Sequence, residues 1–225
     1  GRFTTADVAA MCGCLQARAA GFRLQSVYDV DGRTYLLKLA KSGAQTADGE
    51  GEKLSVLLES GVRFHSTKFS WNKNDAPSNF SLKLRKHLKN RRLEAVRQLG
   101  MDRIVDFVFG TGDLTSHLIL ELYAQGNIIL ADADYNVLTL LRSHRDDDGG
   151  LVIMANRPYP VDQCRPKGSA SLAGLAVAVR DAEDSQTLKG LAEKLVPYGP
   201  AVVTHALLAA GLKPGAKLGQ GRPTA

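Results

Sequence analysis

Residues 93–142 read LEAVRQLGMDRIVDFVFGTGDLTSHLILELYAQGNIILADADYNVLTLLR, and the pattern of this stretch decides the fold. Apolar and polar residues alternate in short runs, and segments containing Gly, Asp or Asn separate one run from the next. A period of two places successive side chains on opposite faces of a strand. We therefore expect an antiparallel meander. Its strands should cover residues 93–98, 104–109, 116–123, 127–131 and 137–142.

The segment that leads into the meander is strongly basic. Residues 81–105 hold eight lysines and arginines and two acids, an excess equal to the net charge of +6 of the whole chain. Phe80, Leu84 and Leu88 repeat every four residues and predict a helix. Concentrated cations are typical of a surface that contacts phosphates, so charge alone predicts a nucleic-acid partner. The expected phosphate-binding residues are Lys83, Arg85, Lys86, Lys89, Arg91 and Arg92.

An ordinary solvated helix face is the alternative explanation of this charge. Residues 81–93 contain six basic residues and no acid. Like charges on adjacent helical turns repel one another, and an anionic partner relieves that repulsion. Phosphate binding is therefore the preferred interpretation.

The N-terminal part predicts a helix followed by a second antiparallel sheet. The helix covers residues 4–20 and ends at Gly21. Asp31-Gly32 favours a two-residue hairpin turn, and residues 40–52 have the composition of a flexible loop. The expected strands cover residues 26–30, 34–39, 54–58 and 62–66. With the meander this gives an α+β fold in which two stacked sheets, or a partly closed barrel, bury the apolar faces.

The C-terminal part predicts a small helical domain. Helices are expected at residues 172–179, 188–195 and 201–210, with Pro-Tyr-Gly-Pro at 197–200 between the last two. The backbone N–H groups of that turn could face a phosphate, although Pro200 is also simply a good first residue for a helix. We expect two domains, residues 1–167 and residues 168–225, the second ending in a polar tail.

Length and composition exclude several classes of protein. The 225 residues are 44% hydrophobic, enough for a soluble globule with a buried core. No apolar run reaches the roughly 18 residues of a membrane span, and no signal region opens the chain. Three cysteines without CxxC spacing argue against a disulfide framework or a zinc site. The start at Gly1 and the polar end suggest a piece of a longer protein.

Enzyme chemistry finds little support. The chain lacks HExxH, GxxxxGK[ST], GxSxG and GxGxxG motifs, and its histidines are scattered singly. We therefore expect no catalytic residue, metal ion or cofactor.

Three further polar residues have ordinary structural explanations. Thr4 and Asp7 have the spacing of a helix capping box, and Asp102-Arg103 falls in a turn between two expected strands. Composition and spacing favour those structural roles.

Seven short strings together resemble a known family. They are RFTTADV at 2–8, VYDV at 27–30, TYLLKL at 34–39, LLESGVR at 57–63, LRKHLK at 84–89, QLGMDRIV at 98–105 and LELYAQGNIIL at 120–130. In this order they resemble the N-terminal domain of the NFACT family, and residues 168–225 resemble the helix-hairpin-helix segment that follows it. The resemblance implies a fold similar to the N-terminal domain of formamidopyrimidine-DNA glycosylases.

The resemblance also implies a function in ribosome-associated quality control. Family members bind a large ribosomal subunit that carries a stalled nascent chain on peptidyl-tRNA, and they admit charged tRNA. In eukaryotes this leads to C-terminal tailing of the nascent chain and to recruitment of the ubiquitin ligase listerin. Because ribosomal RNA performs peptidyl transfer, the domain would position tRNA. The implied location is the cytoplasm, with the nucleus as a further option.

Asp7, Asp102 and Arg103 match the positions that the family uses for tailing, so the resemblance makes them the preferred tRNA-facing site. The coiled coil and C-terminal domain of the family are not in this sequence, so ligase recruitment and stable subunit binding should need more than these residues. Two alternatives remain. One is a generic RNA-binding module. The other is a base-excision enzyme, which needs an N-terminal proline amine where this chain has Gly1-Arg2-Phe3.

Overall fold

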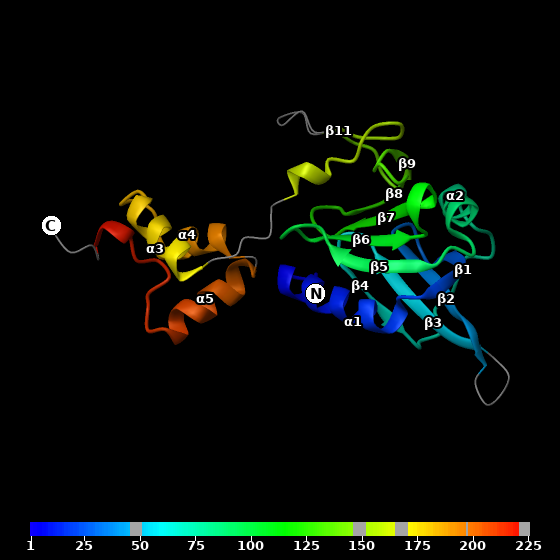
Figure 1. Ribbon diagram of the computed structural model, residues 1–225, viewed down its shortest axis with the longest axis horizontal. Coiled ribbons are helices and arrows are strands. Elements are labelled where there is room, and N and C mark those ends of the chain that lie inside the picture. The colour runs from blue at the N-terminus through cyan, green and yellow to red at the C-terminus, as the bar shows by residue number, and fades with distance from the viewer. Residues whose placement is uncertain (46–50, 146–151, 165–170, 197, 221–225) are drawn as a thin grey trace.

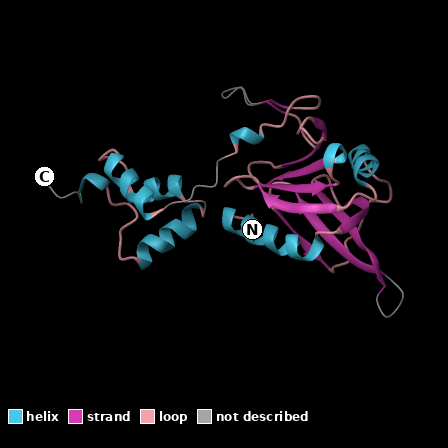
Figure 2. Cartoon of the chain, in the orientation of Figure 1, coloured by secondary structure: helices cyan, strands magenta, loops and turns pink. Residues whose placement is uncertain are grey.

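The computed structural model describes residues 1–45, 51–145, 152–164, 171–196 and 198–220. A larger lobe contains two antiparallel sheets, and a smaller helical lobe follows it (Figures 1 and 2). The α+β class and the two sheets expected from the sequence are confirmed.

Each sheet is a simple meander preceded by one helix. The first half consists of α1 (Thr5–Ala19), β1 (Phe22–Asp29), β2 (Thr34–Gln45), β3 (Gly51–Glu59) and β4 (Arg63–Thr67), with the strands in the order β1-β2-β3-β4. The second half consists of α2 (Asn79–Leu88), β5 (Leu93–Gln98), β6 (Ile104–Phe109), β7 (Ser116–Glu121), β8 (Asn127–Ala131) and β9 (Val137–Leu140), with the strands in the order β5-β6-β7-β8-β9.

The main core lies between the two sheets. Alternate residues of β2, such as Leu37 and Leu39, and alternate residues of β6, such as Phe107 and Phe109, belong to this core. The apolar stripe of α1 joins the same core, and Gln16 Oε1 accepts a 2.7 Å hydrogen bond from the backbone N–H of Val96 on edge strand β5. Burying each such Leu or Phe stabilises the fold by about 1.5–3 kcal/mol.

A second, smaller core explains why β7 and β8 are buried on both faces. Ile119 and Ile129 point away from the main core and pack against Ile153 and Tyr159 of the segment that follows the sheet. That segment contains the two-residue strands β10 (His144–Arg145) and β11 (Val152–Ile153) and the short helix η2 (Val161–Gln163).

Two turns from different sheets touch at a pair of glycines. Gly61 has φ 75° and Gly126 has φ 73°, and a Cβ on Gly126 would lie 1.9 Å from the Gly61 nitrogen. The backbones approach so closely that neither position accommodates a side chain. This contact fixes how the β3–β4 turn sits on the β7–β8 turn.

The helical lobe contains α3 (Leu172–Asp181), α4 (Leu188–Leu195), α5 (Gly199–Ala209) and η3 (Leu218–Gln220). Ser171 and Thr187 cap α3 and α4 by accepting hydrogen bonds from backbone N–H groups. Pro200 stands in the first turn of α5, as its fixed φ favours. None of the described helices is long and apolar enough to cross a membrane.

The structure differs from the sequence expectations at three places in the first sheet. Strand β1 begins at Phe22, four residues before the expected start. The β1–β2 loop is longer than a two-residue turn, because the Asp31 side chain accepts a hydrogen bond from the Arg33 N–H and holds an open loop. Residues 40–45 and 51–52 pair in β2 and β3 rather than forming a loop. The expected domain boundary at 167/168 and Pro197 lie outside the described residues. The similarities to the glycosylase fold and to a helix-hairpin-helix domain stay predictions.

Candidate nucleic-acid interface

The β5–β6 turn places Asp102 and Arg103 at one end of the second sheet. The backbone N–H of Asp102 donates to Leu99 O at 3.2 Å, and the Leu122 N–H donates to Arg103 O at 2.8 Å. Leu99 and Met101 are buried, whereas Asp102 and Arg103 are half-buried. The turn is thus anchored by its apolar members, and its charged members face outward.

The N-terminus of α1 carries the capping box that the spacing predicted. Asp7 Oδ2 accepts hydrogen bonds from Thr4 N at 2.8 Å and Thr4 Oγ1 at 2.7 Å, and Asp7 N donates to Thr4 Oγ1 at 3.2 Å. These bonds, the backbone one first, lower the pKa of the Asp7 carboxyl. Asp7 is nevertheless exposed. The carboxylate caps the helix and still faces solvent.

Gln98 joins these two features. Its Nε2 donates to Asp102 O at 2.9 Å and approaches Thr5 O at 3.5 Å. The structure therefore brings the first turn of α1 and the Asp102-Arg103 turn together, although some 90 residues separate them in sequence. Gln98 itself was not among the residues singled out from the sequence, because its role depends on this tertiary contact.

The start of α5 completes the neighbourhood. The start of α5 lies opposite the start of α1 (Figure 1). A cleft of about 440 Å³ lies between them. Its lining includes Arg2, Thr5, Arg103, Tyr198 and Gly199. Two guanidinium groups and the start of α5 favour an anion here, and Glu193, the one acid among the described lining residues, pairs with Lys189 at 3.7 Å. Arg2 is a site residue that the sequence analysis did not identify, whereas Tyr198, which is 53% exposed, belongs to the turn at 197–200 that it named as a possible phosphate contact.

A second cavity adjoins the first through Arg103, which lines both. It measures about 300 Å³ and also contacts Asp102, Tyr123, Tyr159 and Cys164. Burial, with Asp102 and Glu121 nearby, raises the pKa of the Cys164 thiol to about 11. Arg103 therefore stands at the boundary of the two cavities, and Asp102 lines the second one.

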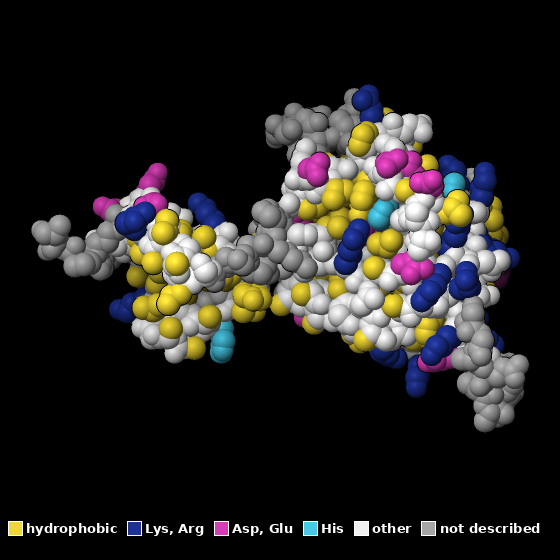
Figure 3. All heavy atoms as spheres, viewed as in Figure 1, with side chains coloured by type: hydrophobic (Ala, Val, Ile, Leu, Met, Phe, Trp, Pro, Cys, Tyr) yellow, Lys and Arg dark blue, Asp and Glu magenta, His cyan; other side chains and the backbone are white. Residues whose placement is uncertain are grey.

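The basic helix α2 lies at the other end of the larger lobe (Figure 1). The six-residue strand β5 carries the chain from α2 toward the Asp102-Arg103 turn, a length of about 20 Å at ~3.3 Å per residue. Figure 3 shows Lys and Arg side chains gathered over the end that carries α2 and β1 to β3. The structure does not unite the six basic residues with Asp7, Asp102 and Arg103.

Three of the six basic residues have protein partners. Arg85 Nε donates to Val27 O at 2.8 Å, and its guanidinium lies 5.3 Å from the Tyr28 ring centroid. Arg91 Nη1 donates to Leu114 O at 3.3 Å, and Arg92 Nε lies 3.7 Å from Glu94 Oε1. These contacts hold α2 and the following segment on the sheets.

The side chains of the other three, Lys83, Lys86 and Lys89, are exposed, and their ammonium groups make no hydrogen bond or ion pair with another described residue. Leu84 and Leu88 bury the opposite stripe of the helix completely. Burial together with Lys86 and Arg91 lowers the pKa of neighbouring His87, so its ring is neutral at pH 7. The free positive charge of α2 is therefore carried by three ammonium groups.

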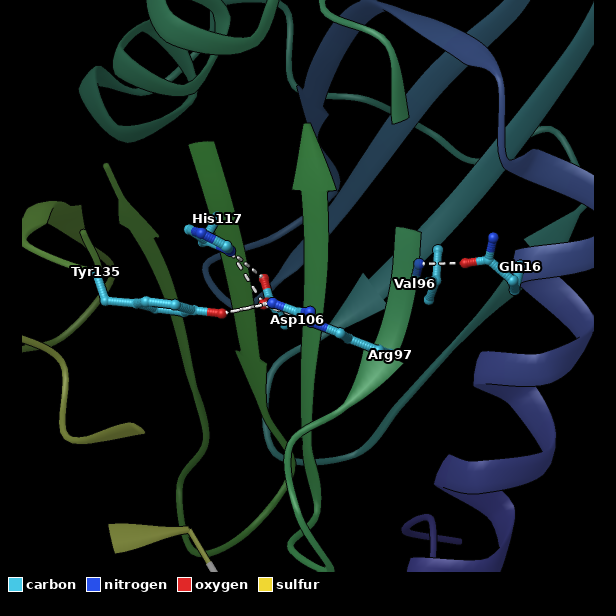
Figure 4. A network of polar contacts seen from close by, with 6 residues as sticks. All are labelled: Gln16, Val96, Arg97, Asp106, His117 and Tyr135. Atoms are coloured by element: carbon cyan, nitrogen blue, oxygen red, sulfur yellow. Dashed lines mark hydrogen bonds and ion pairs between the residues drawn. The ribbon is translucent and has the colours of Figure 1, made fainter. Parts of the chain in front are cut away.

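A buried polar network on the outer face of the second sheet also went unrecognised in the sequence (Figure 4). The fully buried Asp106 accepts from Arg97 Nη2 at 3.1 Å and Tyr135 Oη at 2.7 Å, and His117 Nδ1 lies 3.0 Å from both of its oxygens. Burial and the Asp106 carboxylate raise the pKa of Tyr135 to about 12. The one available signal was an acid inside the apolar run IVDFVF. The network satisfies the buried carboxylate and is separate from the cleft.

Comparison with known proteins identifies the family. A model of the NFACT N-terminal and middle domains matches residues 4–220. The chain belongs to the NFACT family. This confirms the resemblance carried by the seven strings.

The relatives of this NFACT chain are considerably longer. The ribosome quality control complex subunit NEMF homolog of Drosophila melanogaster is 44% identical over 213 residues, which cover 94% of this chain and 21% of that protein. The ribosome quality control complex subunit NEMF of Mus musculus is 42% identical over 218 residues, 96% of this chain and 20% of that protein. The chain thus spans about a fifth of their length.

A solved structure shows the same fold at low sequence identity. The N-terminal domain of the fibronectin-binding protein PavA from Streptococcus pneumoniae has a TM-score of 0.72 and 16% identity, covering 93% of this chain and 84% of that one. This similarity supports the architecture alone.

Proposed function

We propose that this NFACT chain acts in ribosome-associated quality control, where it binds tRNA on a large ribosomal subunit that carries a stalled nascent chain. The observation that carries the proposal is the cleft at the junction of the lobes, where Arg103 meets the N-termini of α1 and α5. The names of the relatives support the biological context.

In this proposal Arg103 contacts a tRNA phosphate or base edge, and Asp102 beside it accepts from a base or ribose donor. An arginine and a carboxylate side by side read a nucleotide more selectively than cations alone, because each rejects groups of its own polarity. Tyr198 offers a ring on which a base can stack. The domain positions tRNA and leaves bond formation to the ribosome.

The exposed lysines of α2 supply affinity in this proposal by contacting phosphates of a different RNA segment. An RNA that is long enough to touch both ends of the lobe gains from both contacts. Nascent-chain tailing and listerin recruitment belong to the full-length protein, acting in the cytoplasm and also, where the protein enters it, in the nucleus.

The proposal is tested by measuring the affinity of the chain for tRNA with Arg103→Ala and Asp102→Ala. Loss of a charged hydrogen bond should weaken binding by Arg103→Ala on the order of tenfold. Arg157→Ala is the matched control, since Arg157 is exposed on the outer segment and does not line the cleft. It should bind within about twofold of the unmodified chain.

Two results would oppose the proposal. One is equal weakening by Arg103→Ala and Arg157→Ala, because the cleft would then contribute only general charge. The other is equally tight binding of tRNA and of a polyuridine of the same length, which is the behaviour of a generic RNA-binding module. Thermal unfolding of each variant shows that a loss of affinity is not a loss of fold.

A further inference from the structure

A further cavity lies apart from the cleft and has none of the cleft's lining residues. It is an open groove of about 1090 Å³ over the first sheet. Its floor is a polar row across all four strands, because β1, β2, β3 and β4 pair in register there. The row consists of Ser26, Lys38, Ser55 and Thr67. These polar side chains can donate or accept hydrogen bonds with a ligand that lies in the groove.

Cations border this groove on several sides. Arg18 from α1, Lys38 from β2, Lys53 from β3 and Lys68 after β4 all line it. Among the described residues that line it, the one acid is Glu52, which lies 3.7 Å from Lys41 in an ion pair. The groove therefore has a positive potential that suits an anionic polymer.

Aromatic rings stand among these cations. Phe69 is 70% exposed and packs against Trp71 in a T-shaped pair with ring centroids 5.3 Å apart. Trp71 Nε1 donates to Thr67 Oγ1 at 3.4 Å, which ties the pair to the end of β4. A ring held by its neighbour yet open to solvent is a ready surface for stacking.

A second ring, Tyr28, also lines the groove, and three basic side chains lie within 6 Å of its centroid. Lys73, Arg85 and Lys38 lie 4.5, 5.3 and 5.8 Å from its centroid. Lys68 and Lys73 both belong to the β4–α2 connection that carries Phe69 and Trp71. Aromatic and basic side chains are thus interleaved over one sheet face.

We propose that this groove binds single-stranded RNA, with a base stacked on Phe69 and with backbone phosphates at Lys38 and Lys68. Stacking on exposed rings combined with a basic groove is how proteins hold single strands without reading their sequence. An acidic peptide would use the cations but would gain nothing from the exposed ring. A duplex hides its base faces and cannot stack on Phe69. The groove is a separate RNA contact from the cleft and does not depend on tRNA binding there.

The test measures binding of a fluorescent ten-nucleotide single-stranded RNA to the whole chain. Phe69→Ala should weaken binding on the order of tenfold, and Phe69→Tyr should restore it. Lys38→Ala with Lys68→Ala should lower the slope of log affinity against log salt by about 1.4, at ~0.7 per phosphate contact on a single strand. Arg157→Ala is the control and should leave both quantities unchanged.

Any of four results would overturn the proposal that the groove binds single-stranded RNA. They are no binding of the oligonucleotide, equal binding by Phe69→Ala and the unmodified chain, equal binding of a ten-base-pair RNA duplex, and displacement by polyglutamate as effective as displacement by polyuridine. The last would assign the groove to an acidic protein. Because Phe69 is exposed, its replacement leaves the fold intact, and thermal unfolding checks this. The tRNA affinity of the same variants reports on the cleft separately.

Discussion

Asp7 is the residue at which a structural and a functional role meet. Its carboxylate closes the capping box with Thr4, and those hydrogen bonds lower its pKa. A carboxyl whose pKa is lower in the folded state stabilises the fold above its ordinary pKa and loses that contribution as the pH falls through the folded pKa. Asp7→Ala should therefore lower the unfolding temperature at pH 7 and have less effect near pH 2. A difference that stays constant between these pH values would contradict the capping role.

Thr4→Ala separates capping from RNA contact, because it breaks the same box and keeps the carboxylate. Both variants should cost about 0.5–1 kcal/mol of stability. If Asp7 faces tRNA, Asp7→Ala weakens tRNA binding more than Thr4→Ala does. Equal tRNA affinities of the two variants would leave Asp7 with the capping role alone.

At this scale the sequence predicted what local spacing controls. The Thr4–Asp7 box follows from a three-residue interval, and the Asp102-Arg103 turn follows from its place after Gly100. It did not predict that Gln98 would span the two or that Tyr198 would face them. Those contacts depend on how distant segments pack, and no local pattern encodes them.

At the scale of elements, α2 separates into a face that binds protein and a face that is free. Replacing Lys83, Lys86 and Lys89 together by Ala should lower the salt slope of tRNA binding by about two to three, at ~0.7–0.9 per phosphate, and leave the unfolding temperature nearly unchanged.

Arg85→Ala should lower the unfolding temperature and leave the salt slope of tRNA binding nearly unchanged. It loses the hydrogen bond to Val27 O and the contact with Tyr28, at a cost of about 1 kcal/mol.

The measurements are salt-dependent tRNA titrations and thermal unfolding of both variants. An unchanged salt slope in the triple variant would remove α2 from the RNA interface. A stable Arg85→Ala variant with a reduced slope would place Arg85 among the phosphate contacts instead.

Short apolar runs separated by Gly, Asp and Asn located every strand of the second sheet, including β7 and β8, which are buried on both faces. The sequence pattern did not predict the paired ends of β2 and β3. Gly, Ser and Ala have a weak strand preference there, and pairing between the strands decides the structure. The β1–β2 loop was mispredicted because the Asp31 side chain, rather than the Asp-Gly backbone, sets its shape.

Across the whole molecule, the basic helix and the Asp102-Arg103 turn, which share residues 81–105 of the sequence, lie at opposite ends of the larger lobe, and the first turn of α1, which carries Asp7, lies beside that turn. Charge composition located the basic helix, and the family resemblance located Asp7, Asp102 and Arg103. Only the fold shows that β5 separates the basic helix from Asp102 and Arg103. It also shows that the helical lobe lines the same cleft as Arg103. An RNA that touches both ends has to extend along the sheets.

The most direct measurement is a cryo-electron microscopy map of the full-length protein on a stalled large ribosomal subunit with tRNA present. We predict tRNA density in the cleft, within contact of Arg103 and the start of α5, with a different RNA segment against the lysines of α2. Density for tRNA only on other surfaces, with the cleft occupied by a ribosomal protein or left to solvent, would contradict the account.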